Sequence, residues 1–141
     1  RPGNAEIFRV RPGAKGLPEW VHGLASFDKR VVLKHHSWAG VDARTFEAAV
    51  ESVHVPVVSF AGLLERHPGF SEAMALQIDT EGHDFVVVRS AVAAGFLPRV
   101  IHYEHKHLAY ADQVACRDLL ASHGYAFSSS RTDTLAYRSA S

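Results

Sequence analysis

The stretch LQIDTEGHDF, residues 76–85, decides the fold of this chain. Its apolar beginning ends at Ile78, and the residues that follow include Asp79, Glu81 and Gly82. This order predicts a buried strand whose carboxyl end opens into an acidic loop. Ligands of open α/β sheets bind just outside the carboxyl ends of the strands. The stretch therefore predicts a strand of a sheet and, at its end, a candidate active site.

A second strand with a polar end follows in RVIHYEHKH, residues 99–107. Its apolar residues predict a strand over Val100–Glu104. If that strand lies beside the first, Glu104 and His105 project into the same crevice as Asp79. A charged residue such as Glu104 is also unfavourable at the end of a buried strand unless it has a partner. Two strand ends that carry acids and imidazoles make an active site the leading hypothesis.

The composition excludes several classes of protein. The 141 residues include 15 basic and 15 acidic side chains, so the net charge is zero and no basic block indicates a nucleic-acid binder. No apolar run approaches the roughly 20 residues of a membrane helix, and no secretory signal is present. Cys116 is the single cysteine and lies on the apolar side of a predicted helix, which indicates a buried, inert thiol. The sequence predicts one soluble, cytoplasmic domain without a nucleic-acid or membrane partner.

Predicted strands and helices alternate along most of the chain. The alternation, followed by two closely spaced strands, predicts an α/β fold with a three-layer, mostly parallel sheet and a C-terminal antiparallel hairpin. We expect Ser26, Ser59 and Asp112 to cap helices. The expected strands are residues 5–11, 53–60, 74–79, 100–104, 125–129 and 134–138. The expected helices are residues 26–34, 59–66, 83–94 and 113–123.

Three carboxylates, at Asp79, Glu81 and Asp84, fall within six residues. Like charges this close raise one another's pKa, which suits a general base or a cation-binding site. Gly82 lets the backbone turn sharply and come near a ligand. Alternatively, the acids only stabilise the positive end of the helix that follows. The spacing leaves both interpretations open.

The residues around the second strand end also have more than one interpretation. Glu104 could form a structural salt bridge with Lys106 or an arginine, and we expect Lys106 and His107 to lie at the rim of the crevice. The acids together with His105 could hold Mg, Mn or Zn. The chain has no fixed-spacing metal motif such as HExxH, so no metal site is assigned.

The run LQIDTEGHDF resembles the K/Q-I-D-x-E-G signature of the FkbM-type methyltransferase family. The resemblance continues through residues 86–90, 100–104, 119–125 and 133–136. Residues 55–64 are similar to the strand and helix before the signature, and residues 20–28 to a variable insertion on the substrate side. In one domain of residues 1–141, the resemblance makes 1–52 the variable substrate-side segment and 53–141 the signature-bearing sheet and helices.

The resemblance implies a class I, Rossmann-like fold that binds S-adenosylmethionine and transfers its methyl group to a hydroxyl of a sugar or other small molecule. It implies that Asp79, Glu81 and Gly82 contact the cofactor at the end of the fourth sheet strand. Glu104 ends the fifth strand across the crevice. Such an enzyme aligns the acceptor oxygen with the methyl carbon and helps to remove its proton. We expect Asp79 or Glu104 to be the base, followed by His105.

The chain departs from the family pattern where the cofactor is expected to bind. Such enzymes use a glycine-rich turn after the first strand and an acid after the second, yet no GxG occurs among the ten glycines. The chain also begins at Arg1 rather than at a methionine. We therefore expect the carboxyl-terminal portion of the domain, with the amino-terminal cofactor half missing. For the chain alone we expect weak or absent cofactor binding and activity. A homodimer or the missing half is expected to cover the exposed edge strands.

Two functions of other classes remain open. A non-catalytic α/β module would keep the sheet and use the crevice for binding or assembly, and the absent glycine-rich turn favours it. A metal-dependent hydrolase built on the same acids is the second alternative. The acids at both strand ends favour the methyltransferase over the binding module.

Overall fold

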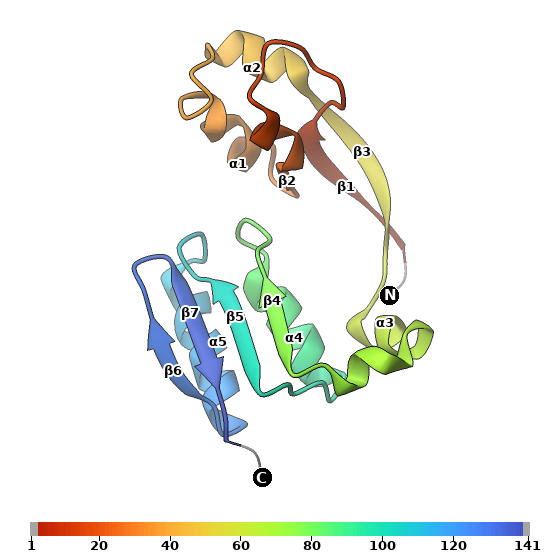
Figure 1. Ribbon diagram of the computed structural model, residues 1–141, viewed down its shortest axis with the longest axis vertical. Helices are drawn as coiled ribbons and strands as arrows, with labels where there is room; N and C mark the ends of the chain where they lie inside the picture. The colour runs from red at the N-terminus through yellow and green to blue at the C-terminus, as the bar shows by residue number, and fades with distance from the viewer. Residues whose placement is uncertain (1–2, 140–141) are drawn as a thin grey trace. The chain divides into compact units, whose positions relative to one another are not determined.

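The computed structural model describes residues 3–139, which form two compact units divided between Val57 and Val58 (Figure 1). The boundary follows strand β3, whereas the predicted division within one domain, at residues 52 and 53, lies inside that strand. The first unit contains β1 (Gly3–Val10), η1 (Glu19–Gly23), β2 (Ala25–Ser26), α1 (Lys29–Leu33), η2 (Lys34–His36), α2 (Ala43–Ala49) and β3 (Val50–Val57). The second contains α3 (Phe60–Arg66), η3 (Pro68–Glu72), β4 (Ala75–Ile78), α4 (Asp84–Ala93), β5 (Val100–Glu104), α5 (Tyr110–Ser122), β6 (Ala126–Ser129) and β7 (Asp133–Tyr137).

The sheet of the first unit has the order β2-β1-β3 and is antiparallel throughout. β3 is an edge strand, which accommodates Pro56 because proline has no backbone N–H to donate to a second neighbour. The predicted strand at residues 53–60 is displaced. It starts at Val50, ends at Val57 and pairs with β1 rather than with a parallel neighbour. No local pattern reveals that pairing, because the partner strand lies far away in sequence.

The helices of the first unit pack around a small apolar core of their own. Asp28, rather than the predicted Ser26, caps α1: its carboxylate accepts a hydrogen bond from the backbone N–H of Arg30 at 2.8 Å. Ser26 lies in β2, where its hydroxyl accepts from the N–H of Asp28. The buried apolar residues of this unit are Val10, Val21, Val32, Ala39, Phe46 and Ala49.

The sheet of the second unit has the order β4-β5-β7-β6. β4 and β5 are parallel, and β7 runs antiparallel to both of its neighbours (Figure 1). One strand thus runs against the other three, and the predicted C-terminal hairpin is confirmed as β6 and β7. The mixed α/β class is also confirmed, while the three-layer arrangement stays a prediction.

Helices α4 and α5 cover one face of this sheet (Figure 1). The β-branched run at Val86–Val88 leaves α4 ambiguous in sequence, but the helix forms and buries Val88 completely. Gly95 follows it with a left-handed φ of 74°. Full burial of each large apolar side chain stabilises the fold by about 1.5–3 kcal/mol. The core consists of Ile78, Val88, Ile101, Tyr103, Leu108, Cys116, Leu120, Tyr125 and Ala136.

Of the two helix caps predicted in the second unit, one is confirmed and the other is wrong. Ser59 caps α3 as predicted, because its hydroxyl accepts from the N–H of Gly62 at 3.1 Å. Asp112 does not cap α5: the helix starts earlier, after Ala109, and Asp112 lies in its first turn. There its negative charge still faces the positive end of the helix. Within residues 3–139, no helix combines the length and apolarity needed to cross a lipid bilayer.

Candidate functional site

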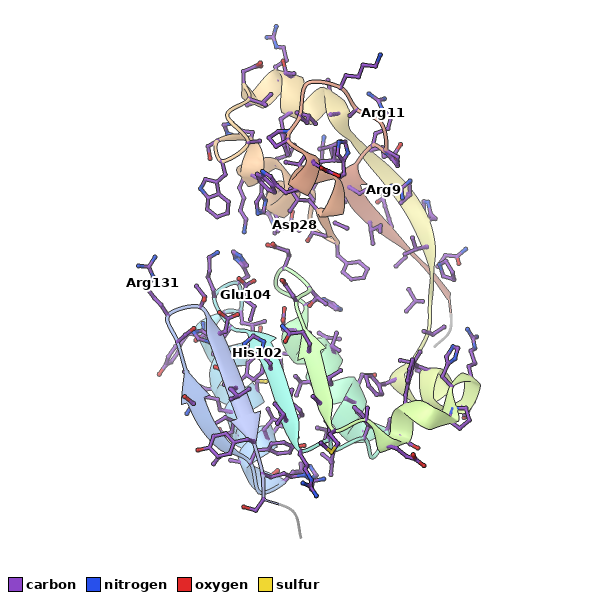
Figure 2. The ribbon with its side chains drawn as sticks, in the orientation of Figure 1. Arg9, Arg11, Asp28, His102, Glu104 and Arg131 are labelled. Carbon is purple, nitrogen blue, oxygen red and sulfur yellow. The ribbon has the colours of Figure 1, made fainter. Side chains whose placement is uncertain are left out.

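The carboxyl ends of β4 and β5 lie side by side, since the strands are parallel neighbours with Ile78 opposite Tyr103. Asp79 follows β4 directly and is exposed, and Glu104 is the last residue of β5. Figure 2 shows Glu104 at this end of β5 and His102 farther back along the same strand. The predicted meeting of two polar strand ends is therefore confirmed.

The loop between β4 and α4 turns through two residues with left-handed backbone. Glu81 has a φ of 52° and Gly82 a φ of 104°. Such angles are uncommon for residues that have a Cβ atom, and the second one suits glycine. A Cβ atom added to Gly82 would lie 3.4 Å from the carbonyl oxygen of His107. Gly82 therefore makes the predicted sharp turn, and the turn brings this loop against the segment after β5.

Asp84, the first residue of α4, is completely buried and joins the two strand ends. Its carboxylate accepts hydrogen bonds from the Thr80 hydroxyl at 2.9 Å and from the backbone N–H groups of Gly82 at 3.4 Å and Glu104 at 3.2 Å. A buried carboxylate needs such donors to offset the loss of water. Asp84 thus holds the acidic loop in place against the end of β5.

Glu81, Glu104 and His107 form what we term the carboxylate cluster. The His107 Nε2 atom lies 3.4 Å from Glu81 Oε2 and 3.5 Å from Glu104 Oε2. The three side chains are only 23, 16 and 17% exposed, respectively, so the cluster is shielded from water. One ligand atom from each lies within 4.8 Å of the others, a set that could hold a metal ion. The prediction that His107 is a rim residue is wrong, because its ring lies between the two carboxylates.

Charge and burial together perturb Glu104. Burial raises the pKa of its carboxyl above the ordinary value, and the negative charge of Glu81 raises it further, with smaller contributions from Asp79 and Asp84. Lys106 lowers that pKa, and its ammonium nitrogen lies 3.9 Å from Glu104 Oε1. The predicted contact with Lys106 is therefore present but does not outweigh the burial and the neighbouring acids. The other oxygen, Oε2, is buried and has no hydrogen-bond partner among residues 3–139.

His105 occupies a different place from the carboxylate cluster. Its Nδ1 atom lies 2.9 Å from the hydroxyl oxygen of Thr134 on β7. The expectation that His105 and Glu104 project into one crevice is wrong, because His105 is held by Thr134 whereas Glu104 lies beside Glu81 and His107. His105 instead lines a pocket of about 120 Å³, together with Tyr103, Gln113, Arg117, Ser129 and Thr134.

Tyr103, His105, Cys116 and Thr134 form what we term the hydroxyl network on the α5 side of the sheet. Burial raises the pKa of the Cys116 thiol from 9.0 to about 11, and it raises the pKa of the Tyr103 phenol. The thiol is completely buried, which confirms its predicted burial. The thiol and the phenol of the network are therefore uncharged at physiological pH.

Most of the chain matches the sequence model of a known protein family. The model of the Methyltransferase FkbM domain matches residues 16–127, which include the acidic loop, all of β5 and the carboxylate cluster. The chain belongs to the FkbM methyltransferase family. No significant match was found among curated proteins or among solved structures. The family resemblance of the signature is thereby confirmed, although residues 133–136, which also carry the resemblance, lie beyond the matched region.

The sequence did not indicate the positions that His107 and Asp84 take at this site of the FkbM domain. The chain leaves the strand after Glu104, so the two-residue alternation stops there, and His107 returns to Glu104 from three residues farther on. Asp84 stands among other acids, and nothing in the pattern separates a buried acid from exposed ones. The place of His107 could have been found only by fixing the end of β5 at Glu104 first.

Proposed function

We propose that this FkbM domain is part of an S-adenosylmethionine-dependent O-methyltransferase that acts on a hydroxyl of a sugar or another small molecule. One observation carries the proposal: Asp79, Glu81 and Glu104 meet at the carboxyl ends of two parallel strands in a chain of this family. Ligands of α/β sheets bind at that edge. The carboxylates there suit a reaction in which a hydroxyl loses its proton as its oxygen attacks a methyl carbon.

Asp79 and Glu104 are the residues that we propose to receive this proton. Asp79 is exposed at the end of β4, so its carboxylate is open to a ligand. Glu104 lies across from it, where the burial that shields the carboxylate also shields an acceptor from water. His105 comes last, because its ring is engaged by Thr134 on the α5 side. An acceptor that lies between the two strand ends would be held for in-line attack.

The residues of this chain fit only part of the cofactor. S-adenosylmethionine would supply a methyl group activated by a positively charged sulfur, with Asp79, Glu81 and Gly82 beside it. The sequence contains no GxG turn, and β4 is an edge strand in the part of the sheet that the structure describes. In the doubly wound strand order 3-2-1-4-5-6, the fourth strand pairs with the first, which carries the glycine-rich turn. We propose that the free edge of β4 pairs with such a strand supplied from outside these 141 residues.

The binding of S-adenosylhomocysteine, measured by isothermal titration calorimetry, tests this proposal. The chain alone should bind it weakly or not at all, since the glycine-rich turn is absent. A chimera that joins the chain to the glycine-rich half of another family member should bind it with micromolar affinity. Asp79→Ala should weaken that binding at least roughly ten-fold, while Asp112→Ala, an exposed acid in α5, should leave it unchanged.

Two calorimetric results would contradict this assignment. Micromolar binding by the chain alone would show that the cofactor pocket is complete without a further half. If a folded chimera binds S-adenosylhomocysteine equally well with and without Asp79→Ala, Asp79 does not contact the cofactor. In either case the acceptor role of the strand ends would then be tested by a methyl-transfer assay on hydroxyl compounds.

An assembly role is the second candidate, and the uncovered face of the sheet favours it. Thr134 and Ala136 on β7 point into the core, while the alternate residues Leu135 and Tyr137 remain 38 and 45% exposed. Apolar side chains on an exposed sheet face are typical of a surface that another protein covers. A homodimer or a separate cofactor half would do so. Light scattering that shows a monodisperse, thermally robust monomer would argue against both.

A further inference from the structure

The carboxylate cluster has the atoms and the spacing of a cation site. It contains two carboxylate oxygens, from Glu81 and Glu104, and one imidazole nitrogen, from His107. Glu81 lies in the loop after β4, whereas Glu104 ends β5 and His107 lies in the segment that follows it, so the cluster is not a by-product of one turn. The loops are joined by the buried carboxylate of Asp84 and by the close approach of Gly82 to His107.

The distances within the cluster fit metal ligands better than hydrogen bonds. The Nε2 atom of His107 lies 3.4 and 3.5 Å from the two carboxylate oxygens. A hydrogen bond between an imidazolium and a carboxylate is shorter, about 2.7–2.9 Å. Ligand atoms that each lie about 2.0–2.2 Å from a tetrahedral cation are about 3.3–3.6 Å from one another. The two distances from His107 already fall in this range, and all three ligand atoms lie within 4.8 Å of one another.

A bound cation would also reduce the repulsion between the two carboxylates of the cluster. Two carboxylates lie close together in a region that is mostly removed from water, and like charges in such a place repel each other strongly. The ammonium group of Lys106 approaches Glu104 on its other oxygen, Oε1. Oε2 of Glu104, the oxygen that faces His107, is buried and has no hydrogen-bond partner within the described residues.

We propose that Glu81, Glu104 and His107 bind one divalent transition cation of the Mn²⁺ or Zn²⁺ class. Carboxylate and imidazole ligands together suit these ions, whereas Mg²⁺ prefers oxygen ligands alone. Three protein ligands leave at least one coordination position open, as in catalytic metal sites. What the cation does there rests on the proposed function: it would hold the acceptor oxygen and leave Asp79 as the free carboxylate.

Cation binding is measured on the 141-residue chain without a histidine tag, after treatment with a chelator. Mn²⁺ is titrated and followed by the loss of the free-ion electron paramagnetic resonance signal, and Zn²⁺ is titrated by calorimetry. Glu81→Gln and Glu104→Gln keep the size of the side chain and remove its charge. Glu65→Gln, on the exposed side of α3, is the matched control, and His123→Gln controls for surface histidines. Circular dichroism confirms that each variant is folded.

We expect one bound ion per chain, and a loss of affinity of at least roughly ten-fold in each cluster variant, because even outer partners of metal ligands contribute that much. The two controls should bind as the unaltered chain does, and a ten-fold excess of Mg²⁺ should displace little Mn²⁺. Absence of binding by the folded chain, or equal binding by all variants, would overturn the site. Displacement by an equal amount of Mg²⁺ would overturn the assignment to this class of ion.

The same variants separate this inference from the proposed function. Cation binding requires no cofactor, so it can be present in a chain or chimera that never binds S-adenosylhomocysteine. Conversely, a chimera could bind S-adenosylhomocysteine in an Asp79-dependent manner but bind no cation. That result would support the methyltransferase function and contradict the proposed cation site.

Discussion

The carboxylate cluster and the hydroxyl network flank the same strand end, yet they satisfy their polar groups in different ways. On the α5 side, Tyr103 and His105 find hydroxyl or thiol partners, and the network has no carboxylate of its own. On the other side, His107 lies 3.4 Å from a carboxylate oxygen of Glu81 and 3.5 Å from one of Glu104, and this Oε2 atom of Glu104 has no hydrogen-bond partner within residues 3–139. Buried polar groups in folded proteins are normally paired within the protein. The comparison indicates that the hydroxyl network belongs to the fold, while the carboxylate cluster is the better candidate for a ligand site.

The largest effect is expected from Asp84→Ala, which removes the support of the carboxylate cluster. Three donors, from Thr80, Gly82 and Glu104, lose their acceptor. The free energy of unfolding should fall by about 3 kcal/mol, because buried donors are left unpaired. Urea unfolding, followed by the NMR signals of β5, measures this loss. Asp118→Ala, an exposed acid on α5, should change stability by less than about 0.5 kcal/mol; an equal effect of both substitutions would contradict the role of Asp84.

Alkaline pH should weaken the hydroxyl network through Cys116. The thiol releases its proton near 9.0 when unfolded, but its pKa is about 11 in the folded chain. Between these values the unfolded state binds fewer protons, so the free energy of unfolding falls as pH rises, by up to about 1.4 kcal/mol per pH unit. The contribution is complete below pH 9 and is lost as pH rises through the folded pKa. Urea unfolding at pH 8 to 11 should show this slope, and Cys116→Ala should reduce it to the part contributed by buried phenols such as Tyr103, whose pKa is also raised; an unchanged slope would rule out the thiol as its source.

A smaller effect is expected when Gly82 is replaced by alanine. The left-handed φ of 104° strains any residue with a Cβ atom, and that atom would lie 3.4 Å from the His107 carbonyl. Stability should fall by about 1–2 kcal/mol. Gly124→Ala, at a φ of 81° with nothing within 4 Å, is the matched control for backbone strain alone. Only the variant at Gly82 should also weaken cation binding, as chemical-shift changes at His107 would show. Equal cation binding by both variants would mean that the turn does not position His107.

The smallest effect is expected from Tyr103→Phe, which removes one hydroxyl from the network. The lost hydrogen bonds, to Thr134 and Cys116, should lower stability by about 1 kcal/mol. Cation binding should not change, because Tyr103 points to the face opposite Glu104. A change in Mn²⁺ affinity in this variant would show that the two centres are coupled.

The second unit could be predicted from sequence largely because its signals are local. Val100–Glu104 is a strand with the predicted bounds, Ser59 caps its helix, and Gly95 and Gly124, both with left-handed φ, follow the two helices predicted at residues 83–94 and 113–123. The first unit could not, because its sheet depends on the pairing of β1 with β3 across a long and irregular segment. Residue propensity carries no information about such distant partners.

The candidate site was only partly predictable, and the reason is geometric. Asp79 and Glu104 were placed correctly because parallel neighbouring strands bring their carboxyl ends together. The choice between His105 and His107 depended on where the alternation of β5 stops, which no residue type marks. The burial of Asp84 depends on three donors, two of them backbone groups of other residues, and is therefore invisible in a list of side chains.

The two consecutive left-handed residues at Glu81 and Gly82 restrict how this domain can change. The same few residues turn the chain, start α4 through Asp84 and carry a carboxylate of the cluster, so a substitution there alters folding and chemistry at once. Laboratory selection for a new acceptor should therefore leave residues 80–84 nearly untouched. New specificities would accumulate at exposed side chains outside this turn, such as Arg131 (Figure 2).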